Sequence, residues 1–218
     1  MAIIQSGASA DLLTVDPTFK AARVTLRPNE VTGSYRATAV SGSIAASTAA
    51  SVLFTFKYTA SGSGTVAVLR RVSIAEQVTT LYTQGGIRFS CYHTRATFTQ
   101  GTGNATALTL TSNNAKKRTS MASTGATAYI CTTLGITGDT ASGEDSTPFA
   151  TGGLDLPAVV TTRPYAGLVD IYDGYSTNVY PIVFATTEGF RLKNDTAFAA
   201  AGVGNLIVNI EWDEYATY

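Results

Sequence analysis

His93 is the one histidine of the 218-residue chain, so acid–base or metal chemistry would be expected there first. It continues the alternation of Ile87, Phe89 and Cys91, which places it on the apolar side of a strand. A zinc site needs further His, Cys or carboxylate ligands at set spacing, and the neighbouring sequence supplies no such set. No G-x-S-x-G motif accompanies it to supply a nucleophile. The sequence therefore indicates a protein that is not an enzyme and that uses no metal or cofactor.

Two charged stretches are candidates for ion or phosphate binding. Residues 138–145 form an acidic, glycine-containing loop with the oxygen ligands that calcium prefers. Their spacing does not match the D-x-[DN]-x-[DN]-G pattern, so we interpret the stretch as a solvated loop. Lys116, Lys117 and Arg118 form a basic tip suited to a phosphate or an acidic protein surface. Because net charge is zero and no aromatic residues interleave, we expect no binding to nucleic acid.

A third group combines tyrosines with carboxylates between residues 165 and 180. Tyrosine is favoured in protein interfaces, and tyrosines beside carboxylates also stack on and hydrogen-bond sugars. Subunit contact is our first interpretation, with Tyr172 and Tyr175 as contact residues. Ordinary packing and a glycan site are the alternatives. The group comprises Tyr165, Asp170, Tyr172, Asp173, Tyr175 and Tyr180.

Charge is divided unevenly along the chain. Twelve of the fifteen Lys and Arg residues precede residue 119, and eleven of the fifteen Asp and Glu residues follow residue 118. This asymmetry suggests complementary surfaces, for instance head-to-tail contacts between copies. The alternative is that strands from both halves interleave and cancel their charges locally. Because only 14% of residues are charged and 44% are hydrophobic, we expect a folded chain that buries much of its surface, including against copies of itself.

The cysteines and the N-terminus bear on where the protein is made. Cys91 and Cys131 are too few for a disulfide framework in a chain of this length, which favours reduced thiols and cytoplasmic synthesis. Residues 1–5 lack the basic start and sustained apolar core of a signal peptide. No run approaches the roughly 18 apolar residues that span a bilayer, so we expect no membrane partner.

The elements that must position these residues are short strands. Alternating apolar stretches separated by Gly, Ser, Thr and Pro predict an all-β fold, an antiparallel β-sandwich of jelly-roll type. Residues 52–58 alternate, residues 61–64 supply a flexible turn, and residues 65–74 are predicted to return as the hairpin partner. Arg70 and Arg71 interrupt the alternation of that partner, which indicates a β-bulge or an exposed edge.

The predicted organisation is one sandwich domain over residues 21–218 with an N-terminal arm at residues 1–20. The arm carries a short apolar island bounded by acids and a proline, and we expect it to lie on a neighbouring subunit. A first edge strand of the same domain is the alternative. Residues 122–164, punctuated by Gly, Thr, Ser and Pro, are expected to form a long irregular connection. The predicted contact residues of the arm are Leu12, Leu13, Val15 and Phe19.

Residues 181–212 are interpreted as a closing hairpin on which the fold is organised. The last strand has one apolar side, which we assign to the core, and a more polar side. On the polar side, Glu211 and Asp213 belong to the acidic excess of the C-terminal half, and we expect them to form a rim that meets a basic neighbour. The apolar side comprises Leu206, Val208, Ile210 and Trp212.

Several stretches resemble virion structural proteins of tailed bacteriophages, namely residues 7–24, 118–121, 188–190 and 202–212. The resemblance implies a structural part of a virion. The favoured role is a capsid decoration or cement protein at the capsid surface, bound between major capsid protein subunits as a homo-oligomer, with a trimer favoured. A tail- or fibre-borne module that binds host glycans is the alternative, and a major tail or capsid building block is the next. Synthesis would take place in the cytoplasm of the bacterial host.

Overall fold

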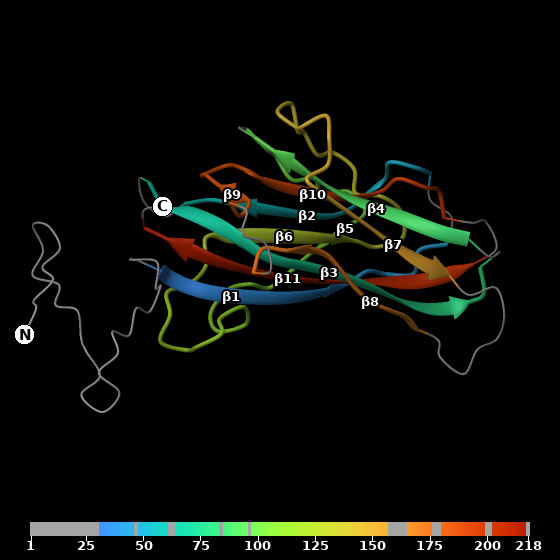
Figure 1. Cartoon of the computed structure of the whole chain (residues 1–218), viewed down its shortest axis with the longest axis horizontal. Coiled ribbons are helices and arrows are strands. Elements are labelled where there is room, and N and C mark those ends of the chain that lie inside the picture. The colour runs from blue at the N-terminus through green and yellow to red at the C-terminus, as the bar shows by residue number, and fades with distance from the viewer. Residues whose placement is uncertain are drawn as a thin grey trace, which may run out of the picture.

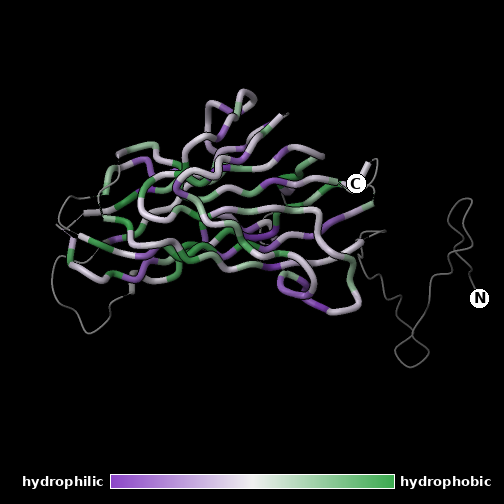
Figure 2. The backbone as a smooth tube through the Cα atoms, turned by 180° about the vertical axis from the view of Figure 1, so that it is seen from behind, coloured by the Kyte–Doolittle hydropathy of each residue, from purple (hydrophilic) through white to green (hydrophobic). Residues whose placement is uncertain are grey.

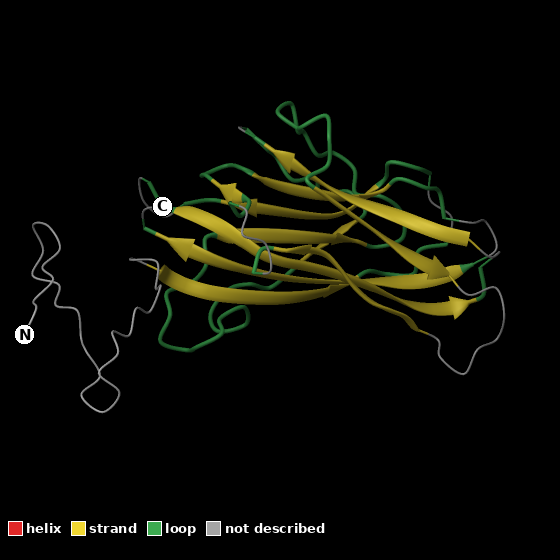
Figure 3. Ribbon diagram, in the orientation of Figure 1, coloured by secondary structure: helices red, strands yellow, loops and turns green. Residues whose placement is uncertain are grey.

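A computed structural model describes residues 31–45, 48–60, 64–82, 85–95, 97–156, 165–175, 180–198 and 202–216 (Figure 1). Within these residues every regular element is a β-strand, and paired strands run antiparallel. Most strands follow the long axis of the molecule (Figure 3). The predicted all-β antiparallel sandwich is confirmed.

The strands form two sheets that enclose one core. The five-stranded sheet has the order β1 (Val31–Val40), β11 (Val203–Tyr215), β3 (Val66–Thr80) and β8 (Tyr165–Asp173), and β9 (Val183–Phe184) also pairs with β3. The six-stranded sheet has the order β5 (Ala105–Ala107), β6 (Ala126–Cys131), β2 (Val52–Tyr58), β10 (Gly189–Asn194), β4 (Gly85–Thr94) and β7 (Ala150–Leu156).

Trp212 joins the two sheets. The inward side of β11 is buried as predicted, and Trp212 is wholly inaccessible to solvent. Tyr35 of β1 stacks on its indole with ring centroids 5.4 Å apart, and Phe56 of the opposite sheet meets it edge-on at 5.2 Å. Such pairs contribute about 0.5–1.5 kcal/mol beyond their burial. Figure 2 shows apolar and polar residues alternating along many strands, the pattern that produces this core.

Both predicted hairpins are wrong. β2 lies in the six-stranded sheet and β3 in the five-stranded sheet, so they are not hydrogen-bonded to each other. Likewise β10 pairs with β2 and β4, whereas β11 pairs with β1 and β3. Alternation identifies the apolar side of a strand but not the strand that completes its hydrogen bonds. Each connection therefore crosses between the layers where a turn within one sheet was expected.

The stretch 122–164 is more regular than predicted, because β6 and β7 both lie within it. The sequence of β7, ATGGLDL, contains two glycines that masked its strand character. Gly152 has a structural reason: a Cβ at this position would lie 3.1 Å from Cγ1 of Ile171 in β8. The glycine lets β7 approach β8, where one edge of each sheet meets and closes that side of the sandwich.

The predicted β-bulge is confirmed at Arg70. The β3–β11 register shifts so that Glu211 pairs with Arg71 and Trp212 pairs with Leu69, which leaves Arg70 as the extra residue.

The arm residues Leu12, Leu13, Val15 and Phe19 lie outside the described residues. In the described part of the chain, no helix has the length and apolar character needed to cross a membrane.

Candidate assembly surface

The outer face of the six-stranded sheet is covered in part by the acidic loop of residues 138–145. Arg191 of β10 pairs with Asp139 and Glu144, and Lys193 pairs with Glu144 at 2.5 Å. All four side chains are only 11–16% exposed. The prediction that this loop is solvated is therefore wrong, because two of its carboxylates are held against the sheet by cations of β10.

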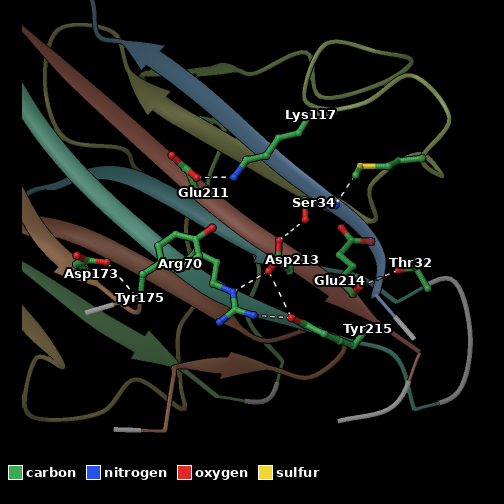
Figure 4. A network of polar contacts seen from close by, with 11 residues as sticks. Thr32, Ser34, Arg70, Lys117, Asp173, Tyr175, Glu211, Asp213, Glu214 and Tyr215 are labelled. Carbon is green, nitrogen blue, oxygen red and sulfur yellow. Dashed lines mark hydrogen bonds and ion pairs between the residues drawn. The ribbon is translucent and has the colours of Figure 1, made fainter. Parts of the chain in front are cut away.

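The outer face of the five-stranded sheet, turned away from the core, carries a second ion-pair network (Figure 4). Nε of Arg70 donates to Oδ2 of Asp213 at 2.7 Å, and Oγ of Ser34 donates to Oδ1 of Asp213 at 2.6 Å. Burial lowers the pKa of the Arg70 guanidinium, but its hydrogen bond to Asp213 and the charge of that carboxylate raise the pKa by more. Asp213, predicted to meet a basic neighbour, thus contacts a cation of its own chain.

The basic tip lies along β1. The backbone N–H of Arg36 donates to the carbonyl of Ala115 at 2.8 Å, next to the tip. Nζ of Lys117 lies 2.5 Å from Oε2 of Glu211, with both side chains a little over a quarter exposed. An ion pair this accessible contributes at most about 1 kcal/mol. Of the remaining tip residues, Lys116 is half-buried and Arg118 is exposed.

Among the described residues, charges from the two halves of the sequence cancel locally in four ion pairs. Each joins a cation from residues 1–118 to a carboxylate from residues 119–218. This arrangement matches the alternative in which strands of both halves interleave. The pairs are Arg70–Asp213, Arg88–Asp195, Arg95–Asp145 and Lys117–Glu211.

The two tyrosines predicted as contact residues have different environments. The hydroxyl of Tyr172 accepts a hydrogen bond from the backbone N–H of Ile182 at 2.9 Å, and its ring meets Phe149 edge-on. Tyr175 is 54% exposed, with the guanidinium of Arg70 positioned over its ring at 5.6 Å. Tyr172 therefore packs inside the fold, whereas Tyr175 presents an accessible aromatic ring beside the network.

The outer face of the five-stranded sheet is ordered in three rows that run across its strands. In the charged row, Arg36 pairs in register with Glu211, Glu211 with Arg71, and Arg71 with Asp173. The signs of charge therefore alternate across all four strands. In the polar row, two residues further along, Thr38 donates to Asn209 at 2.7 Å and Ser73 to Asp170 at 2.6 Å. The polar row comprises Thr38, Asn209, Ser73 and Asp170.

The third row is apolar and is exposed at its two ends, whereas Ile207 is half-buried and Ala75 is buried. Val40 pairs in register with Ile207, and Ile207 with Ala75. The β3–β8 register shifts beside Ala75, which brings it opposite the stretch containing Leu168. Val40 is 55% exposed and Leu168 is 63% exposed, among the most exposed large apolar side chains of the described residues. The apolar row comprises Val40, Ile207, Ala75 and Leu168.

Sequence reasoning missed the apolar row because its members are far apart along the chain. Val40 and Leu168 lie on two strands that are separated by more than a hundred residues, and neither stands out locally. Only the register of β1, β11, β3 and β8 brings them into line. A signal was nonetheless present, since Val40 and Ile207 each fall on the side of a strand opposite to its buried residues.

The single histidine lies within the core. His93 is 4% exposed, and its ring meets Phe184 edge-on at 5.1 Å. Burial and the nearby Arg95 lower its pKa, and Glu188, with Oε2 3.7 Å from Nε2, opposes the change. Across the residues that the structure describes, no cluster of three His, Cys, Asp or Glu side chains is arranged to hold a metal ion.

Both cysteines are free and buried. Burial raises the pKa of the Cys131 thiol to about 12 and raises that of Cys91 as well, so both thiols are protonated at neutral pH.

Comparison of the chain with family models, with curated proteins and with solved structures found no match.

Proposed function

We propose that the chain is a structural subunit of a tailed-bacteriophage virion, and specifically a decoration protein of the head. The observation that supports a binding role is the apolar row, which places Val40 and Leu168 in solvent on an otherwise polar sheet face. An exposed apolar patch rimmed by polar residues is typical of protein–protein contact. The resemblance of the segments around residues 7–24 and 202–212 to virion proteins supports this class of partner.

The proposed mechanism is mechanical. The sandwich covers a junction between major capsid protein subunits, and the arm, through Leu12, Leu13, Val15 and Phe19, adds contact area on a neighbour. A specific contact buries about 800 Å² on each partner. Many copies then reinforce one another, because weak contacts that are made at many sites of one particle add up through multivalency. At the basic tip Arg118 is exposed and Lys116 is half-buried, and both are suited to an acidic capsid surface.

Reconstitution on particles tests this function. Purified chain is added to phage heads that lack it, and occupancy is measured by cryo-electron microscopy, beside a chain lacking residues 1–20. We expect the full chain to occupy the heads at fixed positions and the shortened chain to be lost from them while its circular dichroism is unchanged. No binding by the full chain to heads contradicts the proposal, and full occupancy by the shortened chain contradicts the role of the arm.

A tail-borne glycan-binding module is the second candidate, favoured by Tyr175. Its exposed ring beside Arg70 combines a stacking surface with a hydrogen-bond donor, which sugars require. Binding to a glycan array that Tyr175→Ala removes would support this candidate. Tyr180→Ala is the matched control, because Tyr180 is 93% exposed and is the more accessible tyrosine.

A further inference from the structure

We propose that two copies of this chain pack face to face through the outer faces of their five-stranded sheets. The two-fold axis lies between the copies, runs parallel to the strands and passes between β11 and β3. This proposal rests on the assembly role proposed above and names the partner and the surface. The contact would be isologous, with the same three rows of side chains supplied by both copies.

The apolar row is self-complementary under this symmetry. A two-fold axis parallel to the strands reverses the order of β1, β11, β3 and β8, so Val40 of one copy faces Leu168 of the other. The same operation places Ile207 over Ala75, a large side chain over a small one. Alternating large and small residues across a contact lets the two faces interdigitate. The two most exposed apolar side chains of the row are thereby both covered.

The charged row is complementary under the same operation. Its order across the strands is Arg36, Glu211, Arg71 and Asp173, with alternating sign. Reversal brings Arg36 of one copy to Asp173 of the other, and Glu211 to Arg71. Every charge of this row therefore faces an opposite charge of the partner.

The polar row lies between the other two and also tolerates the contact. Reversal places Thr38 opposite Asp170 and Asn209 opposite Ser73. The amide of Asn209 can donate to the hydroxyl oxygen of Ser73, and the hydroxyl of Thr38 can turn from Asn209 to donate to Asp170. The alternative is a two-fold axis that runs along the apolar row, perpendicular to the strands. It would place Val40 of one copy on Val40 of the other, and it would leave Arg71 facing the uncharged end of the partner's sheet. The alternation of sign thus favours the axis parallel to the strands.

The size of the face suits a second copy. Four strands at about 4.8 Å spacing and about ten residues at 3.3 Å each give roughly 600 Å² on each partner. The total of roughly 1,200 Å² lies at the lower limit of specific protein interfaces. Stacked sheets with this twist pack with their strands within about 30° of each other, which this axis permits. We therefore expect a dimer that dissociates measurably on dilution, and not the trimer that the sequence favoured.

Sedimentation equilibrium of the full chain across a range of concentrations tests the dimer. We expect Leu168→Asp to weaken dimerisation at least tenfold, because it places a carboxylate within the apolar row. The matched control is Leu134→Asp, which changes a 49% exposed leucine outside this sheet and should leave dimerisation unchanged. A monomer at every concentration, as would result if residues 1–30 covered the face, or a trimer, overturns the proposal. Equal effects of the two substitutions also overturn it.

A mixing experiment tests the two-fold geometry itself. Arg36→Glu alone, and Asp173→Arg alone, should each weaken the homodimer, because each creates two like-charge contacts. In a one-to-one mixture of the two variants, both cross-contacts again join opposite charges, so the heterodimer should recover to within a few-fold of the unaltered affinity. Failure to recover, with both variants folded by circular dichroism, overturns the proposed pairing.

The outcome for the dimer is separable from the outcome for the virion role. A chain that dimerises as described but does not bind phage heads retains this inference and contradicts the proposed function. A chain that is monomeric in solution but occupies heads at fixed positions retains the function and contradicts the inference.

Discussion

Two buried glutamates occupy opposite ends of the paired strands β3 and β11, and they are hydrogen-bonded very differently. Oε1 of Glu214 accepts from the indole N–H of Trp212 and the backbone N–H of Gly125, both at 3.2 Å, and from the hydroxyl of Thr124. Glu76 accepts only from the hydroxyl of Tyr82, at 2.6 Å, and its second oxygen has no donor among the described residues. Burial raises the pKa of both carboxyl groups, and hydrogen bonds offset part of the rise.

The carboxylate of Glu214 therefore connects separate elements of the fold, whereas the carboxylate of Glu76 is buried without comparable hydrogen bonds. Glu214 links β11 to the segment before β6, so it fixes the position of that segment against the Trp212 core. That end of the sheet also carries Arg70 and Asp213 and supports the charged row. Glu76 contacts Tyr82 and lies against Gly204, where a Cβ would come within 2.1 Å of its Oε1. A buried carboxyl group with one donor costs stability when it ionises, whereas one with several donors offsets much of that cost.

The largest effect is expected from removing Glu214. Glu214→Ala leaves the donors of Trp212, Thr124 and Gly125 without an acceptor and opens a cavity beside the indole. Each buried unsatisfied donor costs roughly 1–3 kcal/mol, so we expect a loss of about 3–5 kcal/mol in the free energy of unfolding. Urea denaturation at pH 7 measures it. Glu76→Ala is the matched variant and should cost clearly less, because it leaves one donor unpaired. An equal loss in both variants contradicts the comparison.

The amino-acid sequence predicts the buried side of β11 because that strand alternates over its whole length. It also predicts the bulge at Arg70, where two adjacent charges interrupt an apolar alternation. Both features are local and follow from the period of the strand. It does not predict which sheet each strand joins, because β2 and β10 have apolar residues suited to more than one partner. Partner choice depends on packing across the sandwich, which alternation does not encode.

The candidate surface was predictable only in part. Charge alone identifies Lys117, Glu211 and Asp213, and the structure places all three on the outer face of the five-stranded sheet or at its edge. Their partners were not predictable, because Arg70 and Asp213 meet only through the pairing of β3 with β11. The alternation of sign in the charged row depends on three registers at once, and no single stretch of sequence contains it.

An intermediate effect is expected from removing one hydrogen-bond donor at each end. Tyr82→Phe leaves Glu76 without a donor, and we expect a loss of about 1–2 kcal/mol at pH 7. Thr124→Val removes one of several donors to Glu214 and also the acceptor of the backbone N–H of Ala126, at 3.0 Å. We expect about 1 kcal/mol or less from the lost donor and about 1 kcal/mol from the Ala126 bond. Chemical denaturation of the two variants under identical conditions gives the difference. A loss in Thr124→Val that exceeds the loss in Tyr82→Phe by more than about 1 kcal/mol, the contribution of the Ala126 bond, would show that the number of donors does not govern the cost of these carboxylates.

The smallest effect, and the one with a defined pH dependence, is expected from Glu76→Gln. Because the pKa of Glu76 is raised above its ordinary value of 4.5, the folded chain holds this proton to higher pH than the unfolded chain does. Stability therefore falls as pH rises from about 4.5 through the folded pKa, and the penalty is absent below that range.

Glutamine stays neutral and can still accept from Tyr82, so we expect it to stabilise the chain by on the order of 1 kcal/mol at pH 7 and to have little effect at pH 4. Thermal unfolding between pH 4 and pH 8 measures the slope. Glu214→Gln, in contrast, turns an amide donor toward the backbone N–H of Gly125, and we expect it to destabilise the chain at pH 7 and less at pH 4, where the carboxyl group of Glu214 also carries a proton. If Glu76→Gln destabilises the chain at pH 7 as well, the ionised carboxylate contributes to folding and the two ends are alike.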